Sequence, residues 1–143
     1  MSLTADEIEK VSDQLIEAER TCQPIKLISE QFKHLSYEDV YSIQLRSIYK
    51  KVGAGAIIVG KKIGLTSKGM QAQFNIDEPD YGIIVDRTIL REGNPISTKK
   101  LIQPRIEVEI AFLLKEDLKG PGVTLPKVLK ATEGVMPAFE SCW

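Results

Sequence analysis

The spacing of apolar residues changes near residue 56, and this change constrains the fold more than any other feature of the sequence. Before it, apolar side chains recur every three or four residues, as on one face of a helix. After it, β-branched runs such as Ala56–Val59 and Gly82–Val85 are bounded by glycine, proline and aspartate, which is typical of strands. At 143 residues the chain has the length of one domain. We therefore expect a single α+β domain, helical over 1–55 and β-rich over 56–143.

Capping signals predict two helices in the first third of the chain. Thr4–Glu7 is a capping box that begins a helix over 5–21, and Pro24 keeps this helix from continuing. Ser36–Asp39 begins a second helix in the same way, and Gly53–Gly55 ends it. The N-terminal region is therefore expected to be mainly helical.

The rest of the chain is expected to alternate strands with turns. The apolar and β-branched runs predict strands over 101–103, 106–114 and 135–139, the last irregular or at an edge because it contains a proline. Between the last two, a short helix is expected over 124–133, with Gly134 ending it.

Composition and charge exclude several classes of protein. Nineteen Lys and Arg against 20 Asp and Glu give a net charge of −1, which does not supply the basic surface that nucleic acids need. The longest apolar runs are far short of the ~20 residues of a membrane-spanning helix. The two cysteines lie far apart in sequence, so they form neither a disulfide framework nor a zinc ribbon. The acidic N-terminus does not resemble a secretion signal. We expect a cytoplasmic protein that binds neither nucleic acid nor membrane.

Glu107 and Glu109 are the most informative charged residues. Alternation along a strand places both carboxylates on one face, while Ile106, Val108 and Ile110 occupy the other. Two carboxylates this close repel each other, and a hard divalent cation such as Mg²⁺ would remove the repulsion and bind a chelating substrate. Glu140, after the last apolar run, could be a third ligand. The alternative is an ordinary solvated strand face.

The lysine pair Lys61-Lys62 and the segment around Asp80 are two further places where charged side chains could take part in chemistry. In the pair Lys61-Lys62 only one side chain can face inward, and an inward lysine could exchange protons with a substrate. Asp80 lies in an acidic, turn-rich segment. A surface lysine pair and a solvated loop are the alternative interpretations. Gly55–Lys61 formally matches the start of a phosphate-binding loop, but its β-branched spacer favours a strand, so we expect no nucleotide cofactor.

Four segments of the chain together resemble one enzyme family. The segments are Val59–Ser67, Glu78–Gly82, Leu101–Phe112 and Ala131–Glu140. In this order and spacing they resemble the 2-hydroxypenta-2,4-dienoate (2-keto-4-pentenoate) hydratases and the related 4-oxalocrotonate decarboxylases, within the fumarylacetoacetase-like superfamily. The resemblance implies N-terminal helices followed by a mixed β-roll or barrel-like core, assembled into homo-oligomers.

The resemblance also implies a site and an activity. The family's metal ligands match Glu107, Glu109 and Glu140, with Mg²⁺ or Mn²⁺ as the ion, and its catalytic lysine and acidic residue match Lys62 and Asp80. The implied reaction adds water to the small molecule 2-hydroxypenta-2,4-dienoate, giving 4-hydroxy-2-oxopentanoate in the meta-cleavage route of aromatic catabolism.

Two alternatives accompany this expectation. One is 4-oxalocrotonate decarboxylase activity, although that enzyme's acidic position is typically apolar and an anionic Asp80 would repel a second substrate carboxylate. The other is a catalytically silent fragment that only folds or oligomerises, because family members are nearly twice as long and continue where this chain reads Ser141-Cys142-Trp143. The chain is therefore expected to be a C-terminally truncated member, with an incomplete β-rich core.

Overall fold

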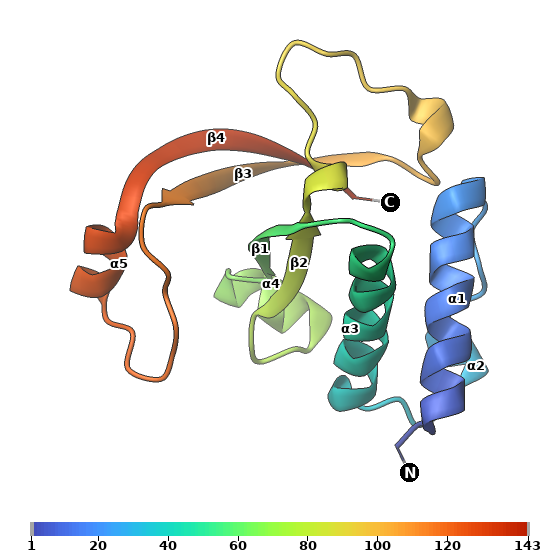
Figure 1. Ribbon diagram of the computed structural model, residues 1–143. Helices are drawn as coiled ribbons and strands as arrows, with labels where there is room; N and C mark the ends of the chain where they lie inside the picture. Colours follow the sequence, from blue (N-terminus) through green and yellow to red (C-terminus); the bar gives the residue numbers. More distant parts are fainter. Residues whose placement is uncertain (1, 143) are drawn as a thin grey trace. The chain divides into compact units, whose positions relative to one another are not determined.

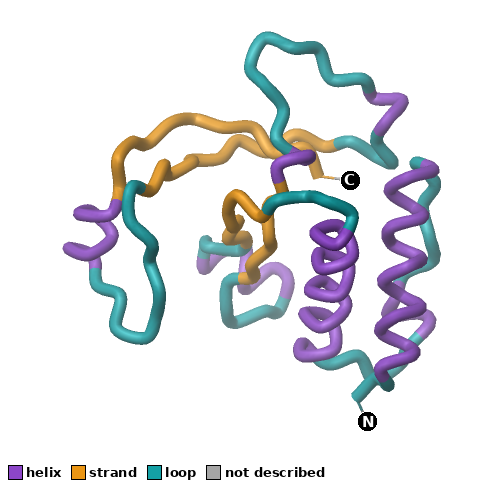
Figure 2. The backbone as a smooth tube through the Cα atoms, viewed as in Figure 1, coloured by secondary structure: helices purple, strands orange, loops and turns teal. Residues whose placement is uncertain are grey.

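Helices come first in the chain and paired strands follow, in a computed structural model that describes residues 2–142 (Figures 1 and 2). The chain forms two units, the first ending at Ser97 and the second beginning at Thr98. The first unit contains α1 (Ala5–Thr21), α2 (Ile28–Gln31), α3 (Tyr37–Gly53), β1 (Ile58–Gly64), α4 (Lys68–Phe74), β2 (Asp80–Val85) and the 3₁₀ turn η1 (Asp86–Thr88). The second contains η2 (Thr98–Lys100), β3 (Arg105–Leu114), α5 (Leu125–Ala131) and β4 (Thr132–Cys142).

Both expected capping boxes are formed, which confirms the starts of α1 and α3. The Thr4 hydroxyl accepts from the Glu7 backbone N–H, and the Glu7 carboxylate accepts from the Thr4 N–H at 2.8 Å. Ser36 and Asp39 repeat this reciprocal arrangement at α3. Each box satisfies backbone donors that a helix leaves without partners in its first turn.

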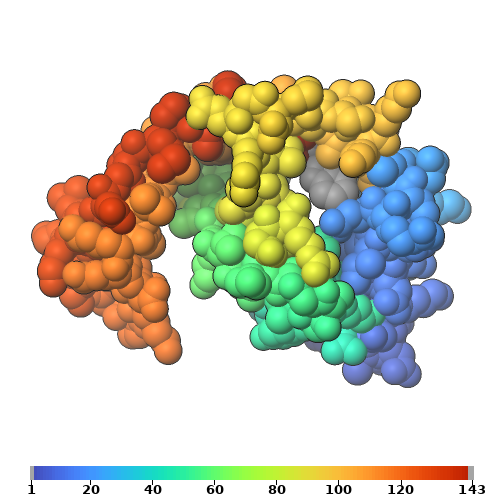
Figure 3. All heavy atoms as spheres, turned by 45° about the horizontal axis from the view of Figure 1, so that its top comes forward, coloured from blue at the N-terminus to red at the C-terminus, as the bar shows by residue number. Residues whose placement is uncertain are grey.

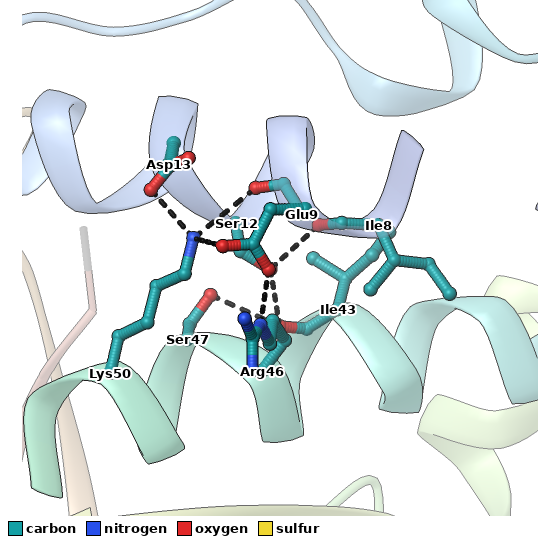
Figure 4. Close-up of polar contacts among 8 residues, drawn as sticks. All are labelled: Ile8, Glu9, Ser12, Asp13, Ile43, Arg46, Ser47 and Lys50. Carbon is teal, nitrogen blue, oxygen red and sulfur yellow. Dashed lines mark hydrogen bonds and ion pairs between the residues drawn. The ribbon is translucent and has the colours of Figure 1, made fainter. Parts of the chain in front are cut away.

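α1 and α3 pack side by side through a small apolar and polar contact (Figure 4). Val11 and Ile43 are buried there, and Ser12, also fully buried, donates its hydroxyl to the carbonyls of Ile8 at 2.8 Å and Ile43 at 3.3 Å. The hydroxyl is tolerated because both carbonyls accept from it, so burial leaves no unsatisfied donor.

Ion pairs line the rim of this helix pair (Figure 4). Glu9 pairs with Arg46 and, at 2.8 Å, with Lys50, which also reaches Asp13 at 2.6 Å. Hydrogen bonds from the Arg46 guanidinium and, to a smaller extent, from the Lys50 ammonium lower the pKa of Glu9 to about 2. Because all of these groups except Lys50 are largely exposed, each pair contributes little to stability.

Asp39 ties the N-terminal segment to α3. Its buried carboxylate accepts from the backbone N–H groups of Ser36 at 3.1 Å and of Leu3 at 2.9 Å. These two hydrogen bonds, of which the one from Ser36 has the larger effect, hold the pKa of Asp39 below its ordinary value. The carboxylate thus joins residues far apart in sequence.

β1 and β2 form an antiparallel ribbon with one face on the helical layer. Ile83 of β2 packs against a buried cluster of Ile48, Ala56 and Val85. Side chains of alternate residues share a face, so Lys62 and Asp80 lie on the opposite face, away from this cluster. Lys62 is half-buried and Lys61 exposed, as alternation predicts for a lysine pair.

β3 and β4 form a second antiparallel ribbon, whose atoms are among the orange and red spheres of Figure 3. Its register pairs Glu107 directly with Glu140 and Glu109 with Ala138. β4 includes Pro137, which is compatible with a strand that has a free edge. The ribbon therefore has a carboxylate face and an apolar face.

Three sequence expectations were wrong in detail. Residues 101–103 form bends, because β4 ends opposite Arg105 and leaves them without a partner strand in the described part of the chain. α5 ends at Ala131, ahead of Gly134, because β4 begins at Thr132 and pairs with the end of β3. The short helices α2 and α4 were not anticipated.

The mixture of helices and strands confirms the expected α+β class. The expected division into residues 1–55 and 56–143 stays a prediction. Across residues 2–142, no helix combines the length and apolar character needed to cross a bilayer.

We predict that Asp39→Asn makes the chain less stable at neutral pH and less sensitive to acid. The carboxylate has a lowered pKa in the folded state, so its stabilisation is present above the unfolded value of about 3.9 and is lost as pH falls through the folded value. Urea unfolding followed by helical circular dichroism from pH 7 to pH 3 measures this. Asp6→Asn, at an exposed carboxylate in the first turn of α1, is the control. Equal acid sensitivity of Asp39→Asn and the parent would contradict the prediction.

Candidate metal centre

Three carboxylates converge on one face of the β3–β4 ribbon. Glu107, Glu109 and Glu140 each offer an oxygen, and these three oxygens lie within 4.8 Å of one another. The convergence follows from the strands, because Glu107 and Glu109 alternate onto one face and the register places Glu140 opposite Glu107. The structure thus brings together all three residues that the sequence and the resemblance singled out as metal ligands.

The spacing of these oxygens suits a hard divalent cation. Two ligands on opposite sides of Mg²⁺ are about 4.2 Å apart, and around Ca²⁺ about 4.6–5.2 Å, given their usual bond lengths. The 4.8 Å limit lies within the Ca²⁺ values, and small side-chain rotations would bring the oxygens to the shorter Mg²⁺ distance. Like charges directly opposite each other destabilise a strand pair, and a cation removes that repulsion. Three carboxylates also leave coordination positions open for a chelating substrate. The donor set therefore fits such an ion.

Lys62 and Asp80 lie on the same face of the β1–β2 ribbon, opposite the face that packs on the buried cluster. Lys62 pairs with Gly82, and Asp80 pairs with Gly64, two positions further along both strands. The two side chains therefore occupy neighbouring positions on one face, at the distance of a diagonal pair. A half-buried lysine and an exposed carboxylate in this arrangement can exchange protons with one bound molecule.

α3 holds the start of β2 through two residues that the sequence did not single out. The Tyr41 ring stacks on Tyr81 with centroids 4.3 Å apart and planes at 10°. The Gln44 side-chain amide donates to the Tyr81 carbonyl at 3.1 Å. Both contacts fix the residue that follows Asp80. An aromatic pair across 40 residues leaves no local sequence signal, so sequence reasoning could not find it.

The end of β1 is fixed by Gln71 of α4. Leu65 adopts the left-handed backbone conformation with φ of 51°, a strained choice for a residue with a side chain. Buried Gln71 donates to the Leu65 carbonyl at 2.6 Å and accepts from Lys68 at 2.9 Å. The turn directly after Gly64 is therefore held by a satisfied buried amide.

Comparison with known proteins finds close relatives. The chain is 44% identical over 135 residues to a 2-hydroxypent-2,4-dienoate hydratase of Pseudomonas putida, covering 93% of this chain and 60% of the relative. It is 42% identical over 130 residues to a 2-oxo-hept-4-ene-1,7-dioate hydratase of Escherichia coli, covering 91% and 49%. No protein-family model matches the chain.

A solved structure agrees with these sequences. The 4-oxalocrotonate decarboxylase of Pseudomonas putida G7, complexed with magnesium and adipate, superposes with a TM-score of 0.92 at 32% identity. The match covers 98% of this chain and 53% of that enzyme. The resemblance to the hydratase and decarboxylase family is confirmed. The expected fold class, with part of that family's core, is confirmed with it. The chain spans about half the length of the relatives in this family that it matches.

The roles of the five site residues remain predictions, and metal affinity tests three of them. We predict that Glu109→Gln weakens Mn²⁺ binding roughly tenfold or more, because it removes one of three charged ligands. Titration of the chain with Mn²⁺, followed by the electron paramagnetic resonance signal of the free ion, measures this. Glu133→Gln, an exposed glutamate of β4 outside the cluster, is the matched control. Equal affinities of Glu109→Gln and the control would remove Glu109 from the ligand set.

Proposed function

We propose that the protein is a metal-dependent hydratase that adds water to 2-hydroxypenta-2,4-dienoate. The observation that carries this proposal is the carboxylate cluster of Glu107, Glu109 and Glu140, whose oxygens lie within 4.8 Å of one another. The identities of 44% and 42% to two hydratases favour hydration over decarboxylation, while identities of 34% occur both to a 4-oxalocrotonate decarboxylase of Pseudomonas sp. and to a 2-keto-4-pentenoate hydratase of Pseudomonas putida.

The three glutamates would hold a divalent cation, Mg²⁺ or Mn²⁺. A bound ion supplies Lewis-acid polarisation of the substrate's carboxylate and 2-oxo groups. The β3–β4 ribbon contributes the geometry, because three ligands on paired strands need little reorganisation to accept the ion. The magnesium in the solved decarboxylase complex supports this choice of cation.

Lys62 and Asp80 would carry the protons. Tautomerisation moves the proton of the 2-hydroxyl group to C5, which makes C4 electrophilic. Asp80, as a carboxylate, is suited to accept a proton from the water whose oxygen bonds to C4, and Lys62, as an ammonium, to donate the proton that arrives at C3. Transfer of the proton from Asp80 to Lys62 then restores both groups, so the sum of these steps is one water added, giving 4-hydroxy-2-oxopentanoate.

Other features of the chain support two further proposals about the whole protein. The face of the β3–β4 ribbon opposite the carboxylates carries apolar side chains, of which Val108 and Phe139 are each 77% exposed. An apolar face of this kind favours association, so we propose a homo-oligomer.

We also propose a cytoplasmic location, in keeping with two cysteines far apart in the sequence.

We predict that the folded chain with Mg²⁺ lowers the ultraviolet absorbance of 2-hydroxypenta-2,4-dienoate, because hydration removes the conjugated dienol. EDTA should abolish the change and excess Mg²⁺ restore it. Product analysis for 4-hydroxy-2-oxopentanoate confirms the reaction. Absence of turnover by folded, metal-loaded chain would reject the proposal and favour a silent unit that only folds or associates. Faster release of carbon dioxide from 4-oxalocrotonate than hydration would assign the decarboxylase reaction instead.

We predict that Asp80→Asn slows hydration roughly 100-fold while Mn²⁺ affinity stays at the parental value. The variant loses a proton acceptor but keeps all three carboxylates of the cluster. Initial rates at saturating substrate measure the loss. Asp77→Asn, an exposed carboxylate in the loop before β2, is the control. Hydration by Asp80→Asn at the parental rate would exclude Asp80 from proton transfer.

A further inference from the structure

Two glycines lie directly across the β1–β2 ribbon from the proposed proton-transfer residues. Asp80 pairs with Gly64, and Lys62 pairs with Gly82. A β-carbon at Gly64 would lie 2.2 Å from Asp80 Oδ1, and one at Gly82 would lie 2.9 Å from Lys62 Cγ and 3.3 Å from its Cδ. Each functional side chain therefore lies flat across the opposite strand, in the space that a side chain there would fill.

The backbone does not require glycine at either position. Neither Gly64 nor Gly82 has a positive φ, so an alanine could adopt both conformations. Glycine inside a strand is also unfavourable, because it has more conformational freedom to lose and no side chain to pack. At both positions, the space that a side chain would need is already occupied by the side chain paired with it on the other strand.

Gly60 shows that the feature is specific. It lies on the same strand and the same face, two residues before Lys62, and pairs with Ile84. A β-carbon there would meet Ile84 at 3.8 Å, an ordinary contact, and Gly60 adjoins the register irregularity of the ribbon. The collisions are therefore confined to the two glycines opposite Lys62 and Asp80.

We propose that Gly64 and Gly82 are positioning residues. Because they have no side chain, the Asp80 carboxylate and the Lys62 stem can lie flat against the ribbon. This inference rests on the proposed function for its purpose, but its geometry is independent of it. Alanine at Gly64 forces the carboxylate to rotate away from β1, because no real contact is as short as 2.2 Å. Alanine at Gly82 lifts the lysine stem off β2. Either change moves a proton-transfer group without altering that group's chemistry.

Side-chain rotamers of Asp80 test the geometry directly. Three-bond couplings between the backbone and Asp80 Cγ, measured by NMR on the labelled chain, report its χ1 angle. We expect Gly64→Ala to change these couplings and Gly60→Ala to leave them unchanged. The urea midpoint of unfolding gives a second measurement. In the parent, Gly64→Ala should lower this midpoint more than Gly60→Ala does. In an Asp80→Ala background, this difference between the two substitutions should disappear. Unchanged couplings in a folded Gly64→Ala variant, or an undiminished loss in the double variant, would overturn the inference.

Kinetics test the consequence for the reaction. We expect Gly64→Ala and Gly82→Ala to lower kcat roughly 10- to 100-fold while KM and Mn²⁺ affinity stay near parental values, since misplacement by about 1 Å can have this effect. Gly60→Ala should retain parental kcat. A parental kcat in both variants would overturn the positioning role. An inactive parent would reject the proposed function, and the inference would then be decided by the Asp80 couplings alone.

Discussion

Side chains of neighbouring residues on a strand point to opposite faces, and the register between two strands decides which of them share a surface. Both groups of site residues in this protein depend on that rule. Glu107 and Glu140 meet because β3 and β4 pair at that position, and Lys62 and Asp80 share a face because β1 and β2 pair as they do. A slip of one residue in either ribbon would separate the group it carries.

The two ribbons handle charge in different ways. On β3–β4, three carboxylates of the same sign are held close together, an arrangement that is unfavourable until a cation binds. On β1–β2, one lysine and one aspartate lie on a face that also carries three glycines and Ile84. The first arrangement suits ion binding, and the second brings two groups of opposite charge onto one face.

Local signals in the sequence account for the parts of the fold that were anticipated. The capping boxes at Thr4 and Ser36 act within four residues, so the starts of α1 and α3 could be predicted. Alternation placed Glu107 and Glu109 on one face, but the position of Glu140 depends on a strand register that no local pattern encodes. Its place after the last apolar run made Glu140 a possible third ligand, and the family resemblance favoured it. The glycines opposite Lys62 and Asp80 were missed because their pairing also depends on register.

The position of the carboxylate cluster along its hairpin has a consequence for folding. Glu107 and Glu140 pair close to the open end of the β3–β4 ribbon, while the connection through α5 closes the other end. An isolated two-stranded ribbon is marginal in water. An ion shared by these carboxylates would act as a staple across the open end, so strand pairing and ion occupancy become one linked equilibrium. The persistence of this hairpin would then follow the concentration of free cation around it.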